Sequence, residues 1–310
     1  MTLPKFVTSP LTGRDATLVN TLSSARSIDG YRKEFNYDAT MDFANIPEFG
    51  IYQCDTGYRF YYPFTLTGDE SLYRCLQQGF EGHYKENKWE YDAGLAQVRA
   101  QDSLLDVGCG EGGFLAKAKL KGALVSGIEL TGAAAAVARG KGITVHEELL
   151  DRHEKVGHYD VVTSFQVLEH VADPLVFLQG CVRVLRPGGT LVIGVPNNDG
   201  FLRLDPDCLL NQPPHHMGLW NRASLTAVAP LIGLEIKAFE VEPLAELGWY
   251  QAVIENAYLK GWRKRLFYRL GFADFLRQYI RENANTIAGH SILVVYKKPL
   301  ARRTFVAAGL

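Results

Sequence analysis

Short apolar runs alternate with helical patterns through the middle of this chain. Each run is four to seven residues long, as expected for a buried strand, and most are followed by a segment with a period near 3.6 residues. Strands that alternate with helices are typical of βα units in an open, mostly parallel sheet. The runs that we interpret as strands are 104–107, 123–128, 142–146, 159–165 and 190–195.

The first 95 residues have a different pattern and predict a separate N-terminal region. Six aromatic side chains fall between positions 52 and 64, and residues 51–60 read as two short strands around a turn. A helical lid is expected over 72–91. We therefore divide the chain into an aromatic-rich region (1–95), an α/β domain (96–300) with a helical insert at about 240–289, and a tail (301–310).

A glycine-rich turn between the first strand of the α/β domain and its helix is the strongest local signal. Gly108, Gly110 and Gly112 follow the strand, and glycine allows backbone angles and close ligand approach that other residues exclude. Asp106 lies at the strand's end. Glu129 closes the next apolar run 21 residues after Gly108, the usual spacing of an acid that binds ribose hydroxyls.

Asp-Val-Gly-Cys-Gly-Glu-Gly at 106–112 and Gly-Ile-Glu at 127–129 resemble the signature of class I S-adenosylmethionine-dependent methyltransferases. Leu-Arg-Pro-Gly-Gly-Thr-Leu at 185–191 is a second marker of that family, and we expect a turn at 186–189. The resemblance implies a doubly wound, Rossmann-like sheet of seven strands, in which the last strand is antiparallel and lies between the fifth and sixth.

The same resemblance implies S-adenosyl-L-methionine as the cofactor and a role for each signature residue. Asp106 and Gly108 would hold its aminoacyl end, Gly110 and Gly112 would allow close passage, and Glu129 would accept both ribose hydroxyls. Ligands of open α/β sheets bind at the carboxyl ends of strands, so residues that follow the fourth strand would lie beside the methionine part. These are Phe165 and Gln166.

Candidate chemistry for the acceptor lies in the Pro-Pro-His-His segment at 213–216, which resembles methyltransferases acting on sugars and related small acceptors. An alcohol nucleophile needs a proton acceptor, and histidine titrates in the right range. His216 or His215 is our candidate base. Glu169 and His170 are an alternative acid–base pair, although they can equally serve to fix their loop.

Ser9-Pro10-Leu11-Thr12-Gly13 and Cys54-Asp55-Thr56-Gly57 resemble the two knuckles of a zinc ribbon in methyltransferases of bacterial glycan clusters, with most thiols lost. Hydroxyls are poor zinc ligands, so we predict a ribbon-like scaffold without metal. By this analogy the acceptor is a sugar, a sugar phosphate or a nucleotide-linked sugar.

Charge, apolar run length and cysteine content argue against several other classes of protein. The net charge of −1 gives no basic field for nucleic acid, and no apolar run approaches the length of a membrane span. The N-terminus lacks the apolar core of a signal peptide, and five scattered cysteines fit reduced thiols in a cytoplasm. The basic, aromatic stretch 262–269 is interpreted as a solvated helix face in preference to a membrane-surface helix or a phosphate clamp. The oligomeric state is not predicted.

Three alternatives to methyl transfer onto a sugar stay open. A methyltransferase for a quinone or lipid-type acceptor would use the same cofactor. A nicotinamide-dependent oxidoreductase would use the glycine turn for a dinucleotide, although Asp106 would then place a carboxylate near a pyrophosphate. An inactive methyltransferase-like module would bind the cofactor without turnover.

Overall fold

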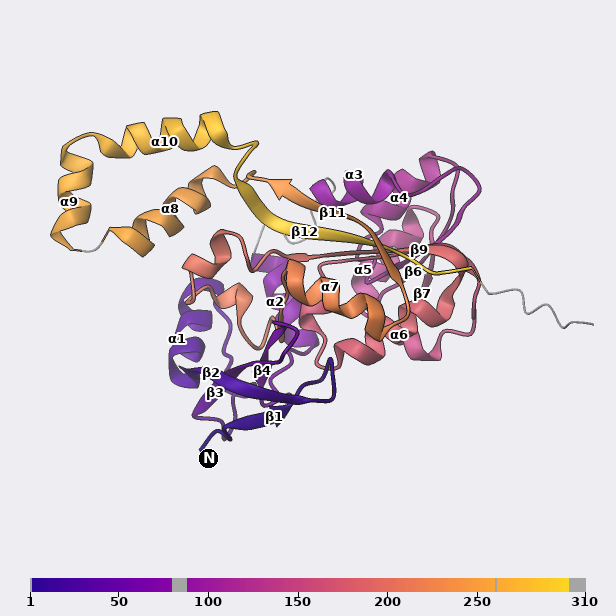
Figure 1. Ribbon diagram of the computed structural model, residues 1–310, viewed down its shortest axis with the longest axis horizontal. Helices are drawn as coiled ribbons and strands as arrows, with labels where there is room; N and C mark the ends of the chain where they lie inside the picture. The colour runs from indigo at the N-terminus through magenta and orange to yellow at the C-terminus, as the bar shows by residue number, and fades with distance from the viewer. Residues whose placement is uncertain (1, 80–87, 260, 301–310) are drawn as a thin grey trace, which may run out of the picture.

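The computed structural model describes residues 2–79, 88–259 and 261–300, which form two sheets and their helices (Figure 1). The larger sheet has seven strands in the order β11-β12-β9-β8-β5-β6-β7. Strands β5 to β9 pair in parallel, while β12 runs antiparallel between β9 and β11, so the predicted sheet is confirmed. The strands are β5 (Ser103–Val107), β6 (Leu124–Ile128), β7 (Thr144–His146), β8 (Tyr159–Phe165), β9 (Leu185–Pro196), β11 (Glu235–Pro243) and β12 (Ala288–Lys297).

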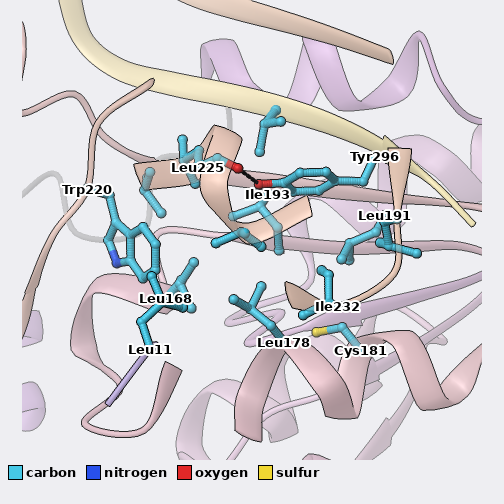
Figure 2. Packing of buried hydrophobic residues seen from close by; sticks show 14 of the residues in the cluster. Leu11, Leu168, Leu178, Cys181, Leu191, Ile193, Trp220, Leu225, Ile232 and Tyr296 are labelled. Carbon is cyan, nitrogen blue, oxygen red and sulfur yellow. Dashed lines mark hydrogen bonds between the residues drawn. The ribbon is translucent and has the colours of Figure 1, made fainter. Parts of the chain in front are cut away.

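Alternate residues of each strand point to opposite faces of this sheet, and apolar residues on both faces pack against helices. Leu105 and Ile193 pack with helices α6 and α7, whereas Leu104 and Val192 pack with α3, α4 and α5. Figure 2 shows the first of these layers, where the Tyr296 hydroxyl donates a 2.6 Å hydrogen bond to the carbonyl oxygen of Leu225. The helices are α3 (Trp89–Leu95), α4 (Gly113–Leu120), α5 (Gly132–Gly140), α6 (Pro174–Val184) and α7 (Arg222–Leu231).

The smaller sheet is antiparallel, with the order β1-β2-β3-β4-β10, and it joins the two predicted regions. Its last strand comes from the α/β part of the chain. Next to that strand, the fully buried Trp220 lies with its ring centroid 4.3 Å from that of Tyr58. The elements are β1 (Phe6–Thr8), β2 (Asp15–Ser23), β3 (Glu48–Gln53), β4 (Arg59–Tyr62), β10 (Gly218–Leu219), α1 (Ser24–Phe35) and α2 (Glu70–Gly79). The domain boundary near 95 stays a prediction, and part of the proposed lid, 80–87, lies outside the described residues.

Two local predictions can be compared with the backbone. The expected turn at 186–189 is instead part of β9, where the pairing with β8 skips from Leu185 to Thr190 as a bulge. The two ribbon-like segments do form turns, since Gly13 bonds back to Ser9 and Gly57 bonds back to Cys54. An Arg14–Asp55 ion pair of 2.8 Å connects these turns.

A helical arm fills the predicted insert between β11 and β12. Figure 1 shows it extending away from the rest of the molecule, with α9 at its tip. It contains α8 (Leu247–Tyr258), α9 (Trp262–Arg269) and α10 (Phe272–Asn283), and its base packs on the 3₁₀ helix η3 (Phe201–Leu204). Over the described ranges, none of the helices has the length and apolar character needed to cross a bilayer.

Candidate active site

The glycine turn after β5 depends on backbone angles that side chains disfavour. Gly108, Gly110 and Gly112 have φ angles of 76°, 52° and 76°. A Cβ at Gly108 would stand 2.4 Å from Cγ2 of Val167, and one at Gly112 would stand 2.6 Å from Cδ1 of Ile143. These two positions therefore require glycine for space as well as for conformation.

Glu129, directly after β6, is bound to this turn through its side chain. Its Oε2 accepts a 2.9 Å hydrogen bond from the Gly110 N–H, and its Oε1 accepts a 2.8 Å bond from the Thr131 N–H. The residue is 9% exposed. Each carboxylate oxygen has more than one lone-pair site, so the carboxylate can still accept two hydroxyl donors from a ligand.

Asp106 lies on β5 beside Thr163 of β8, and the parallel register pairs these two residues. The Thr163 hydroxyl donates a 2.7 Å hydrogen bond to Asp106 Oδ1. Burial raises the pKa of Asp106 to about 7, although the Thr163 bond opposes this rise. The sequence analysis missed Thr163. The sequence does show a polar residue inside an apolar strand at this position. Which side chain Thr163 contacts, however, depends on the register between β5 and β8.

Gln166 has an unusual backbone for a non-glycine residue, with φ of 56°. Its Nε2 donates a 2.7 Å hydrogen bond to Oε1 of the buried Glu90, which also accepts 2.9 Å from the Ser291 hydroxyl. Neither partner was predicted. Phe165 packs with its ring centroid 4.9 Å from that of Phe114 in the core, so contact between this ring and a cofactor stays a prediction.

Three histidines meet where the Pro-Pro-His-His loop approaches the end of β8. The His215 and His216 rings stack at 4.5 Å, and their centroids lie 4.6 and 4.8 Å from that of His170. His170 belongs to the 3₁₀ helix η2 (Leu168–His170), and the other two follow η4 (Leu209–Asn211). Both predicted base candidates are thus brought together with one half of the alternative acid–base pair.

Hydrogen bonds orient all three rings in the same sense. The Nδ1 atoms face oxygen acceptors: the His215 carbonyl for His170, the Leu210 carbonyl for His215, and Asn211 Oδ1 for His216. Asn211 is itself fixed, since its Nδ2 donates 2.9 Å to Asn198 Oδ1. Each Nδ1 therefore carries the proton, and each Nε2 keeps its lone pair.

Charge is disfavoured on His216 and on Glu169. Burial lowers the pKa of His216 well below its ordinary value, and the neighbouring His215, His170 and His290 lower it further. Burial also raises the pKa of Glu169 to about 8, and within the described ranges neither of its carboxylate oxygens has a hydrogen-bond partner. At neutral pH the site thus holds a neutral imidazole at position 216 and a mostly protonated Glu169.

The residues fit two kinds of ligand. Two buried carboxylates beside a glycine turn match a ligand with a cationic group and ribose hydroxyls, which is the chemistry of S-adenosylmethionine. The ring nitrogens of His170, His215 and His216 lie within 4.8 Å of one another, as those of a metal site do, and so do ligand atoms of His146, Glu148 and His153. The prediction of no metal therefore stays open.

The middle of the chain matches a known protein family. A family model described as a methyltransferase domain matches residues 85–238. A ubiquinone biosynthesis O-methyltransferase of Pseudomonas aeruginosa is 32% identical over 167 residues, which cover 46% of this chain and 70% of that protein. The protein of the same name from Marinobacter nauticus is 35% identical over 133 residues, or 38% of this chain and 56% of that protein.

A solved structure supports the fold. The crystal structure of a SAM-dependent methyltransferase from Archaeoglobus fulgidus aligns with a TM-score of 0.51 at 17% identity, covering 74% of this chain and 100% of that chain. The M. nauticus match spans just over half of that relative's length. Strands β1 to β4 and the helical arm lie outside the residues that the family model matches.

Proposed function

Because this chain belongs to the class I S-adenosylmethionine-dependent methyltransferases, we propose that it methylates a ring hydroxyl of a quinone-type acceptor. The names of the two curated relatives support this acceptor better than the sugar that the sequence analysis favoured. The nicotinamide alternative is set aside by the family membership. The remaining question is how the site's own residues serve an O-methyl transfer.

The cofactor side of the site is assigned to the glycine turn and its two acids. S-adenosylmethionine supplies a methyl group that is already activated on a sulfonium. Asp106 would bind the ammonium of the aminoacyl end, and such a cation would draw the buried carboxyl into its charged form. Glu129 would accept the ribose hydroxyls while it keeps its bonds to Gly110 and Thr131. Together these contacts orient the methyl group, which is the main work of such an enzyme.

The observation that carries the acceptor side is the orientation of His216. Its Nδ1–H is engaged by Asn211, so Nε2 carries the lone pair, and its lowered pKa keeps the ring neutral at physiological pH. His216 Nε2 would take up the proton of the acceptor hydroxyl, while the bound cofactor would supply the methyl group and keep the electron pair of the broken carbon–sulfur bond. A phenolic hydroxyl, with a pKa near 10, gives up its proton to a weak base far more readily than a sugar alcohol does. The weak base at position 216 therefore favours a phenolic acceptor.

The test is transfer of a labelled methyl group to a catechol-bearing quinone precursor without its isoprenoid tail, in parallel with a panel of nucleotide-linked sugars. We expect methylation of the ring hydroxyl, at least about 100-fold slower in His216→Ala. His158→Ala is the matched control, since His158 is exposed at the opposite end of β8. Transfer to a nucleotide sugar but to no phenol would overturn the acceptor, and an unaffected rate in His216→Ala would overturn the base.

A further inference from the structure

The helical arm exposes an unusual amount of apolar surface. Its tip and outer helix carry eight large apolar side chains in solvent, two of them, Trp262 and Phe275, at 69% exposure. Scattered exposed apolar residues are ordinary, but a group of this size on three consecutive helices indicates an interaction surface. The eight side chains are Tyr258, Trp262, Leu266, Tyr268, Leu270, Phe272, Phe275 and Tyr279. We call them the arm surface.

Helix α10 shows that this exposure is patterned. Ala273, Leu276 and Ile280 form an inward stripe that packs toward α8, with Ile280 and Leu276 in the cluster at the arm's base. A second stripe at positions 272, 275 and 279 repeats the same helical spacing one residue earlier and faces solvent. A helix needs only the first stripe to pack against its own protein. The second stripe is available for something outside the chain.

The arm is also the basic part of an otherwise slightly acidic chain. Residues 262–283 contain six arginine or lysine side chains and two acidic ones, whereas the whole chain carries a net charge of −1. Across the part of the chain that is described, Arg265, Arg269 and Arg281 make no ion pair. Positive charge that is not neutralised within the protein favours an anionic partner.

We propose that the arm surface docks on an anionic lipid bilayer. Helices with tryptophan, phenylalanine and leucine beside lysine and arginine lie in the interface plane of a membrane, with the rings at the headgroup level and the cations on anionic lipids. A second copy of the chain is disfavoured as the occupant, because a symmetric contact would bring two basic surfaces together. The sequence analysis favoured a solvated face for 262–269. The exposure of the aromatic rings is the reason to depart from it.

Docking of the arm on a bilayer would also affect the candidate active site, an inference that rests on the proposed function. At the arm's base, Trp249 lies with its ring 4.8 Å from Phe201 and 5.4 Å from His290, between centroids. The His290 carbonyl accepts a 2.7 Å bond from Asn197 at the carboxyl end of β9, the edge at which the candidate site lies. An arm on the bilayer would therefore hold the site close to the phase in which a quinone-type acceptor dissolves.

Sedimentation with lipid vesicles tests the proposal without cofactor or acceptor. The full chain is mixed with phosphatidylcholine vesicles with and without phosphatidylglycerol, at low and physiological salt. We expect binding to the anionic vesicles alone, weakened by salt. Two double variants, Phe275→Ser with Tyr279→Ser and Arg265→Glu with Arg269→Glu, should each lower the bound fraction about tenfold or more. Leu120→Ser is the matched control, since Leu120 is 90% exposed on α4.

Several outcomes would overturn the proposal. These are absence of binding, equal binding by all variants, or a solution dimer that the Phe275→Ser change dissociates. Circular dichroism checks that the variants stay folded. Turnover of the tail-less acceptor in solution should be the same in the arm variants and the parent protein. If the chain binds vesicles but methylates no phenol, the proposed function fails and the bilayer proposal stands.

Discussion

The backbone N–H of Met217 donates a 2.7 Å hydrogen bond to the carbonyl oxygen of Glu169. This bond ties the histidine loop to the short helix that follows β8. On one side of it, Gly218 pairs with Phe60 in the N-terminal sheet, and on the other, Gln166 bonds to Glu90. The proposed proton acceptor, His216, is thus positioned by contacts with both sheets.

Replacing Asn211 with aspartate should move the pH dependence of the proposed reaction. In the parent protein the pKa of His216 is lowered by burial and its histidine neighbours, so a neutral base persists well below pH 6.5. A carboxylate at Nδ1 stabilises the imidazolium and raises this pKa. The acidic limb of the kcat profile should therefore shift upward by about one pH unit. Asn20→Asp, a change on an exposed strand residue, should leave the profile unchanged.

Glu129→Gln should weaken cofactor binding while the fold is kept. The amide can accept hydrogen bonds through only one of its two terminal atoms, so a bond to Gly110 or Thr131 and one to a ribose hydroxyl are lost. Titration calorimetry with S-adenosylhomocysteine should show a loss of about 1–3 kcal/mol. The exposed Glu154→Gln provides the control. Equal affinity of Glu129→Gln and the parent protein would refute the ribose assignment.

Comparing Gly108→Ala with Gly233→Ala separates two contributions to the loss of stability when a side chain is placed in the left-handed region. These are backbone strain and steric overlap. Both glycines have positive φ, at 76° and 67°, but a Cβ at Gly233 would meet nothing within 4 Å. Gly233→Ala should therefore cost only the conformational term of about 1–2 kcal/mol. Gly108→Ala adds the overlap with Val167, and urea denaturation should show a loss larger by about 1–3 kcal/mol. Similar losses for the two variants would mean that Val167 moves away freely.

The sequence predicts the large sheet well because its signals are local. A strand of five residues, a glycine turn and a helix are encoded in consecutive positions, as at 103–120, and the order of the strands follows from the family's signature. Even so, the Pro-Gly-Gly segment at 186–189 reads as a turn. Backbone hydrogen bonds of Gly188 and Gly189 to Lys298, more than 100 positions away in the sequence, hold it in β9 instead.

The candidate site was predicted in part for the same reason. Asp106, the glycines and Glu129 stand in one motif, whereas Thr163 becomes a partner of Asp106 only through the register of two strands. His170 and His216 are 46 positions apart in the sequence. The backbone hydrogen bond between Met217 and Glu169 brings their segments together, and no side-chain pattern in the sequence predicts that bond. Exposure of the arm's aromatic rings likewise depends on which stripe of α10 packs inward.

Asp106 should make the cofactor-free protein less stable as the pH rises. Its usual pKa of 3.8 applies to the unfolded chain, and burial raises the value in the folded protein to about 7. The folded state therefore binds the proton more tightly. This contribution to stability is complete below pH 4 and is lost as the pH rises through 7. At pH 8 the folded protein must carry the buried charge.

Asp106→Asn removes this penalty and is the test. Without cofactor, the variant should exceed the parent protein in free energy of unfolding by roughly 2–4 kcal/mol at pH 8 and match it near pH 4. Thr163→Val should have the opposite sign at pH 8, because it removes the hydrogen bond that stabilises the charged carboxylate. S-adenosylhomocysteine should raise the melting temperature of the parent protein more than that of Asp106→Asn, since its ammonium pairs with the carboxylate. Parallel pH–stability curves for the parent protein and Asp106→Asn would show that Asp106 stays charged in the folded state.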